Sequence, residues 1–213
     1  MGVIVGNTVY VDEPATNVKF QKLLRLSEFP YSLLLIGTGF REVFSLNYKF
    51  YAAAFYMNPL ILDNLEPWKG RSAAEIQRDS SLFGFIYQAP LEKSLKIVPV
   101  LDISGEMCWD VLVGAVFRRF KSPTSSVDFI ALSTFHDILT NCSLKKGCSI
   151  FLTWPQPSKL LLHLSAEGIP SAAVATIQSE SVAHCLFDVF FGRGPVSPSL
   201  KASVSKGIAS ILK

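Results

Sequence analysis

The chain has 213 residues, 49% of them hydrophobic and 17% charged, with a formal net charge of +3 at pH 7. Its basic residues form no cluster denser than Arg118-Arg119 or Lys145-Lys146, which argues against a nucleic-acid partner. No apolar run reaches the about 20 residues of a membrane span, so we expect the apolar residues in one domain, residues 1–213, around a core or a cavity.

The N-terminal third reads as strands followed by a long hairpin. Its most informative residues are Arg41 and Tyr51, which stand among apolar and very small residues. A tight connection at 45–47 would pair Phe44 with Tyr48 and place Arg41 opposite Tyr51. Short strands are expected at 7–12, 18–20 and 23–26, before the hairpin.

Alternation along the hairpin predicts which side chains share a face. The small residues Gly39 and Ala53 would then face each other beside Arg41 and Tyr51, which leaves room for another group. An Arg and a phenol at the end of an apolar trough suit an acid with an apolar tail. The shared faces are Leu33, Leu35, Gly37, Gly39 and Arg41 on the first strand, and Tyr51, Ala53, Phe55 and Met57 on the second.

A plainer interpretation of the same residues stays open. Arg41 could be a solvated strand-end residue paired with the neighbouring Glu42. The glycines could mark only bulges or kinks.

The rest of the chain alternates helices and strands. A helical stretch begins at Pro59, Ser72 and Glu75 form the pattern of a capping box, and Asp79 opens another helix. Helical spacing of apolar residues follows Gly105 and resumes at Val127. Strands are expected at 91–103, 148–154, 159–165 and 170–178, and helices at 179–191 and 199–212. This order indicates an α+β domain with helices over one side of a mostly antiparallel sheet.

The four cysteines, Cys108, Cys142, Cys148 and Cys185, contain no C-x-x-C pair and lie in apolar surroundings. We expect reduced, buried thiols, no metal and no cofactor, because the histidines also lack ligand spacing. Residues 1–10 lack the basic start and long apolar segment of a signal peptide.

Four segments together resemble the chalcone isomerase superfamily of plants, from about Asn17 to the C-terminus. The resemblance implies an open-faced β-sandwich: a large antiparallel sheet covered by a layer of helices, with the ligand between them. The segments are Leu-Ile-Gly-Thr-Gly-Phe-Arg at 35–41, Trp-Lys-Gly-Arg-Ser-Ala-Ala-Glu at 68–75, Ala-Pro-Leu-Glu-Lys at 89–93 and Gly-Pro-Val-Ser-Pro at 194–198.

Segments 75–83, 132–135 and 187–192 are most similar to the plastid fatty-acid-binding proteins of this superfamily. True isomerases use an Arg and a Thr on neighbouring strands, and a Lys, Tyr and Asn nearby. Arg41 is kept here, but the other positions carry Tyr51, Pro99, Cys108 and Ala115, and the Ser/Thr near the penultimate helix falls at 183–184. Loss of this polar set argues against the isomerase reaction.

The resemblance therefore implies a non-enzymatic protein of the chloroplast stroma that binds a medium- to long-chain fatty acid such as laurate. Arg41 and Tyr51 would hold the carboxylate, and we expect a monomer. The expected acyl-tail residues are Phe55, Met57, Leu101, Met107, Cys108, Leu112 and Phe135. Two alternatives remain: a chalcone–flavanone isomerase with residual activity, and a non-catalytic helper of the flavonoid pathway.

Overall fold

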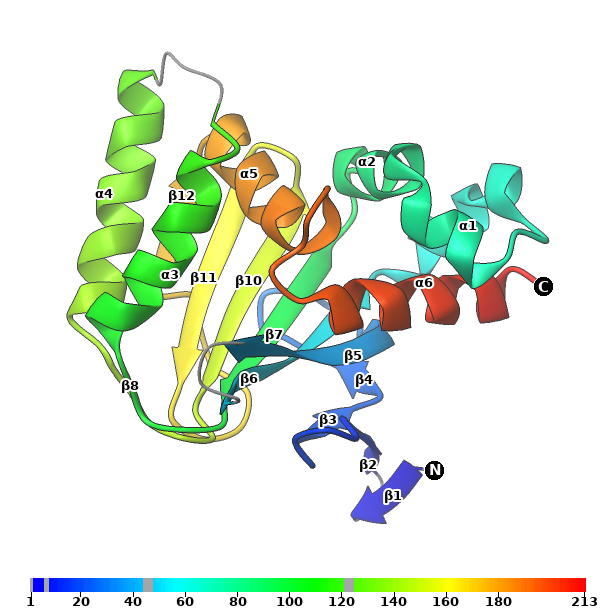
Figure 1. Cartoon of the computed structure of the whole chain (residues 1–213), viewed down its shortest axis with the longest axis horizontal. Helices are drawn as coiled ribbons and strands as arrows, with labels where there is room; N and C mark the ends of the chain where they lie inside the picture. The colour runs from blue at the N-terminus through cyan, green and yellow to red at the C-terminus, as the bar shows by residue number, and fades with distance from the viewer. Residues whose placement is uncertain (1, 6–7, 44–47, 121–124) are drawn as a thin grey trace.

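A seven-stranded antiparallel sheet forms the centre of the computed structural model, which describes residues 2–5, 8–43, 48–120 and 125–213. The helices lie on one face of this sheet, and a three-stranded sheet lies on the other (Figure 1). The order across the large sheet is β12-β11-β10-β7-β6-β5-β4. This arrangement confirms the expected α+β class and the helix-covered antiparallel sheet.

The elements follow the expected order closely. The strands are β1 (Gly2–Val5), β2 (Thr8–Asp12), β3 (Lys19–Gln21), β4 (Leu23–Leu24), β5 (Leu33–Val43), β6 (Tyr48–Met57), β7 (Lys93–Pro99), β8 (Ile103–Ser104), β9 (Ser143–Leu144), β10 (Ser149–Gln156), β11 (Lys159–Ser165) and β12 (Ala175–Gln178). The helices are η1 (Pro59–Asn64), η2 (Glu66–Trp68), α1 (Ala73–Arg78), α2 (Ser80–Gln88), α3 (Gly105–Phe117), α4 (Ser126–Thr140), α5 (Glu180–Phe191) and α6 (Pro198–Ile211).

Local capping explains where several helices begin. Ser72 and Glu75 form the predicted capping box of α1, and Asp79 accepts hydrogen bonds from the backbone of Ser81 and Leu82 at the start of α2. These groups satisfy N–H donors that have no partner inside the helix. No helix in the described part of the chain is long and apolar enough to cross a membrane.

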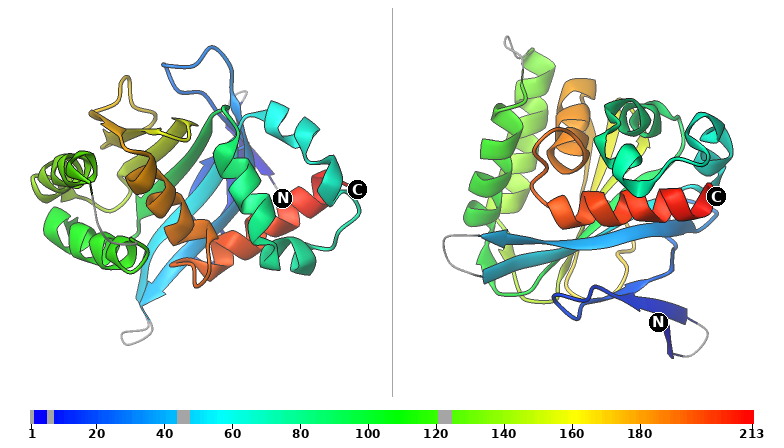
Figure 2. Two further views of the ribbon diagram at one scale, coloured as in Figure 1. Left: turned by 90° about the horizontal axis from the view of Figure 1, so that it is seen from above. Right: turned by 45° about the vertical axis from the view of Figure 1, so that its right-hand side comes forward.

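The expected strand at 91–103 is wrong in one respect, because it is interrupted after Pro99. Ile103 and Ser104 leave the large sheet and pair with Leu144 and Ser143 in a separate ribbon. This ribbon joins the starts of α3 and β10, and α3 and α4 stand side by side beyond it (Figures 1 and 2). The break therefore positions the helical pair over the sheet.

The face predicted for the first hairpin strand is also partly wrong. The register of β5 against β6 shifts between Leu35 and Gly37, which is a β-bulge. Such a bulge adds one residue and reverses the alternation. Leu33 and Leu35 consequently pack on the far side of the sheet with Tyr56, whereas Ile36 packs under the helices. On β6 the prediction is right: Tyr51, Ala53, Phe55 and Met57 share the helix-covered face.

The glycines of β5 make room for α6 rather than for a ligand. A Cβ atom on Gly37 would lie 2.6 Å from the Val204 backbone nitrogen, and one on Gly39 would lie 2.2 Å from that of Leu200. Helix α6 lies directly against β5 (Figure 1). The sequence-based expectation that the small residues open a trough is therefore corrected.

Serines of α6 complete the hydrogen bonding of β5. The Thr38 N–H donates to Ser203 Oγ (3.1 Å), and the Phe40 N–H donates to Ser199 Oγ (2.9 Å). The Ser197 hydroxyl donates to the Phe40 carbonyl oxygen (2.6 Å). Because β4 covers only the first residues of β5, these side chains protect an otherwise open strand edge. They also fix the strand that carries Arg41.

Candidate functional site

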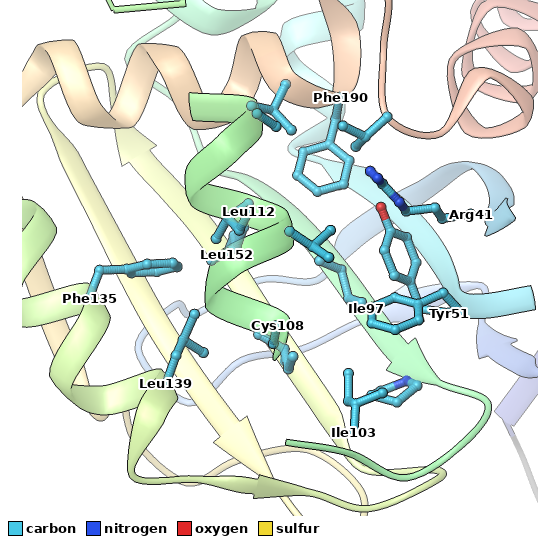
Figure 3. A pocket seen from close by; sticks show the side chains of 17 residues that line it. Arg41, Tyr51, Ile97, Ile103, Cys108, Leu112, Phe135, Leu139, Leu152 and Phe190 are labelled. Atoms are coloured by element: carbon cyan, nitrogen blue, oxygen red, sulfur yellow. The ribbon is translucent and has the colours of Figure 1, made fainter. Parts of the chain in front are cut away.

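An apolar pocket lies between the sheet and helices α3, α4 and α5 (Figure 3). Strands β6, β7 and β10 form its floor, and Val196 lines it from the connection between α5 and α6. Of its 17 lining residues, only Arg41, Tyr51 and Cys108 carry a polar side-chain atom. Enclosed apolar pockets with a few polar groups are typical ligand sites.

Arg41 and Tyr51 lie directly opposite each other on β5 and β6, as the sequence predicts. Gly39 is opposite Ala53 in the same register. In Figure 3 the Arg41 guanidinium and the Tyr51 hydroxyl point toward one another at one end of the cavity. The strand pairing thus brings the only cation and the only phenol of the cavity lining together.

The predicted turn, however, has a different register. Glu42 pairs with Lys49 and Val43 with Tyr48, so a second irregularity follows Arg41. The predicted Phe44–Tyr48 pair is therefore wrong, and its turn at 45–47 lies outside the described residues.

Arg41 has no charged partner among the residues that the structure describes. Its Nε atom is buried and has no hydrogen-bond partner within the described part of the chain. The ion pairs found among those residues do not include Arg41 or Glu42. A guanidinium stays charged in proteins, and burying it without a partner is unfavourable. The position is therefore suited to an anion that is not part of this chain.

Tyr51 and Cys108 are both neutral near pH 7. Burial raises the pKa of the Tyr51 phenol, although the positive charge of Arg41 acts in the opposite direction. Burial also raises the pKa of the Cys108 thiol to about 11. Tyr51 can therefore donate a hydrogen bond, and Cys108 is a poor nucleophile because the thiolate is the reactive form.

Three of the seven predicted acyl-tail residues, Cys108, Leu112 and Phe135, line the cavity. Phe55 lies outside the lining because it packs on α5, with its ring 4.5 Å from that of Phe191. Met57 is fully buried farther along β6, where the next residues enter η1.

Leu101 and Met107 also lie outside the lining. Met107 is 50% exposed, because the helical repeat turns it away from the face that carries Cys108 and Leu112. Leu101 is partly buried in the segment that leaves the large sheet after β7.

Sequence reasoning missed most of the cavity lining. The repeat that places Cys108, Leu112 and Ala115 on one face of α3 also includes Val111, so this residue was predictable. Strand alternation similarly relates Ile150 to Leu152. No local pattern indicates Phe190 or Val196, whose positions depend on how α5 and the following connection pack. The remaining missed residues are Phe50, Ile97, Ile103, Leu139 and Val189.

The positions aligned with isomerase polar groups gather at this cavity. Pro99, Cys108 and Ala115 all line it together with Arg41 and Tyr51. Residues 183–184 do not: the Ala183 carbonyl accepts a hydrogen bond from Trp154 Nε1 (2.9 Å), and His184 packs on Tyr87. Helix α5 contributes Val189 and Phe190 instead.

Comparisons with known proteins agree with this architecture. A family model described as chalcone-flavanone isomerase matches residues 16–211. The chalcone–flavanone isomerase of Canna generalis is 27% identical over 189 residues, covering 85% of this chain and 84% of that protein. The enzyme of Oryza sativa subsp. japonica is 26% identical over 205 residues, covering 92% and 88%.

Among solved structures, that of a fatty-acid binding protein of Arabidopsis thaliana is similar to the structure of this chain. It matches with a TM-score of 0.75 at 18% sequence identity, covering 95% of this chain and 98% of that one. At this identity the match establishes a shared fold.

Proposed function

The chain belongs to the chalcone isomerase family, and we propose that within this family it binds a free fatty acid without converting it. The carboxylate lies against Arg41 and Tyr51, and the acyl chain lies in the apolar cavity under α3. The Arg41 Nε atom, which is buried and has no hydrogen-bond partner within the described residues, carries this proposal.

The chemistry of the two polar residues fits a carboxylate. A guanidinium can donate two parallel hydrogen bonds to the two oxygens of one carboxylate. The neutral Tyr51 hydroxyl adds a third donor without adding a charge that needs its own partner.

The rest of the cavity fits an alkyl chain. Its other lining side chains are apolar apart from the Cys108 thiol. Each buried methylene contributes about 0.8 kcal/mol, so ten give about 8 kcal/mol before the ordering costs of binding. The polar groups that isomerases place at positions 99, 108 and 115 would be left without partners beside such a chain.

Mass spectrometry of the protein purified from bacteria tests the proposal. Native spectra should show a population heavier by the mass of one fatty acid, and solvent extraction should release that acid. Delipidated protein should then bind laurate with a stoichiometry of one. A protein that carries no acid and binds no laurate after delipidation would contradict the proposal.

Chalcone isomerisation is the second candidate, because the curated relatives described above bear that name and Arg41 is retained. The reaction needs groups that orient the enone and its phenolate, and Pro99, Cys108 and Ala115 offer no such donors except a protonated thiol. An absorbance assay with a chalcone decides this point. Conversion above the spontaneous rate, lost in Arg41→Met, would favour the enzyme.

A non-catalytic flavonoid-pathway helper is the third candidate. A pocket filled by its own aromatic side chains would favour it, and Phe50, Phe135 and Phe190 do line this pocket. Recovery of a bound acid from the purified protein would argue against it. For the binding protein we keep the chloroplast stroma as the expected location and a monomer as the expected state. Fractionation of plant cells and light scattering of the purified protein test these two expectations.

A further inference from the structure

A second candidate site lies outside the fatty-acid cavity, at the start of α6. A surface groove there is bounded by α1, by the connection between α5 and α6, and by the first turn of α6. Helices α1 and α6 lie side by side (Figure 1). Three cations, Arg78, Arg193 and Lys201, line the groove, and its lining contains no acidic residue. Surface cations usually alternate with acids, so this composition is unusual.

Lys201 is the most informative of the three cations. Lys201 is only 8% exposed, and its Nζ donates a hydrogen bond to the Gly192 carbonyl oxygen (2.9 Å). The ammonium also lies 5.0 Å from the centre of the Phe83 ring. No carboxylate of the described residues lies within ion-pair distance of it. Burial lowers the pKa of Lys201, and the negative charge of Asp188, which lies beyond that distance, only partly offsets this effect.

The acids on the flanking elements are already engaged. On α1 and its cap, Glu75 accepts from Ser72, and Asp79 pairs with Arg71 (2.7 Å). Asp188 of α5 pairs with Arg119 (2.8 Å). Helix α6 itself contains no acidic residue. Arg78 also lowers the pKa of Glu75, and Asp188 raises that of Lys201, so these acids act on the groove as well. The three acids stand against five cations, Arg71, Arg78, Arg119, Arg193 and Lys201, so a net charge of two positive units remains around the groove.

The backbone adds to the same field. Helix α6 has 14 residues, and no side chain caps its first turn, because Ser197 bonds to Phe40 of β5 instead. The N-terminus of a helix carries partial positive charge and free N–H donors. Pro198 of this first turn lines the groove. The partial positive charge of this helix end therefore adds to the charge of the three side chains.

We propose that this groove binds a phosphate-bearing anion through Arg78, Arg193 and Lys201. A phosphate monoester carries up to two negative charges at pH 7 and matches the fork of a guanidinium. The fatty-acid carboxylate is bound elsewhere, at Arg41, so this inference does not depend on the proposed function. The phosphate can belong to a small soluble molecule or to a lipid headgroup.

Calorimetric titration of the whole chain with inorganic phosphate tests the proposal, at constant ionic strength. We expect saturable binding with a Kd below about 10 mM. The double variant Arg78→Gln/Arg193→Gln should weaken it at least about 10-fold, since charge-assisted bonds contribute most of the affinity. Both residues are exposed, so the variant should fold. Arg25→Gln is the matched control, because Arg25 is an exposed arginine that follows β4 and does not line the groove. This variant should bind phosphate as the wild type does.

Two further arms identify the source of the phosphate. Tighter binding of glycerol 3-phosphate than of inorganic phosphate, lost in the double variant, would indicate a soluble monoester. Binding to vesicles that contain phosphatidic acid, but not to pure phosphatidylcholine vesicles, would indicate a headgroup if the double variant abolishes it. Absence of saturable phosphate binding, or equal binding by the double variant, would overturn the proposal.

Discussion

Gly39 of β5 and Leu200 of α6 pack backbone against backbone. A Cβ atom at Gly39 would lie 2.2 Å from the Leu200 nitrogen and 2.4 Å from its Cα. Ser197 and Ser199, which precede Leu200, form hydrogen bonds with the backbone of Phe40 on β5. This contact fixes α6 on the strand that carries Arg41, so it supports the site although it touches no ligand.

Gly39→Ala should destabilise the protein by at least about 1–3 kcal/mol, because the new methyl group meets backbone that cannot move aside. Urea unfolding measures the change. Gly84→Ala in α2 is the matched control, since a Cβ there meets nothing within 4 Å. That control should be neutral or stabilising by up to about 1 kcal/mol. Equal midpoints for Gly39→Ala and the wild type would refute the packing argument.

Tyr51→Phe should lower the affinity for laurate by about 10-fold, because one hydrogen bond to the carboxylate is lost. The loss of a buried hydroxyl should leave the fold intact. Tyr56→Phe is the control: its hydroxyl donates to the Gln21 carbonyl oxygen (3.0 Å) on the other side of the sheet. It should change stability only. Calorimetry with delipidated protein measures both, and a stronger effect of Tyr56→Phe on affinity would contradict the assignment.

Leu112→Trp should reduce laurate affinity at least about 10-fold, because the larger ring fills the cavity that the acyl chain needs. Met107→Trp changes the same helix at a position that is 50% exposed and should bind as the wild type does. A fluorescent fatty acid displaced by laurate provides the readout. If both variants bind normally, the acyl chain lies somewhere else.

Asp79→Asn should destabilise the protein at pH 7 by about 1 kcal/mol, since a charged group loses its hydrogen bonds to Trp68 Nε1 and Arg71. A hydrogen bond from Ser81 contributes most to lowering the pKa of Asp79 to about 2. The unfolded state therefore takes up the proton first, and the stabilisation is lost as the pH falls from about 4 toward about 2. Urea midpoints of variant and wild type should converge between pH 7 and pH 3. A difference that stays constant or widens would contradict this.

The sequence was sufficient to predict the fold class and the pairing of Arg41 with Tyr51 across β5 and β6. Apolar periodicity and capping residues located most elements, and counting residues back from the turn placed Arg41 opposite Tyr51. That pair is correct although the pairs next to the turn are shifted by one residue. Bulges depend on the packing on both faces of a sheet, so local alternation does not predict them.

The cavity lining was less predictable. Gly37 and Gly39 were predicted to leave space for a ligand, because the sequence does not show which distant element packs against a small residue. The sequence pattern around Phe55 is the same whether this residue lines a cavity or packs in the core. Only the contact of its ring with that of Phe191 shows that it packs in the core. Tertiary contacts between distant segments decide both cases.

The preference for laurate over 1-dodecanol tests the account most directly, because the two ligands share an alkyl chain and differ in the carboxylate. The wild type should bind laurate at least about 100-fold more tightly, since two charge-assisted hydrogen bonds favour the acid. Arg41→Met keeps the side chain long and apolar, and it should reduce this preference to about threefold or less while dodecanol binds as before. If Arg41→Met retains the full preference for laurate, Arg41 does not bind the carboxylate.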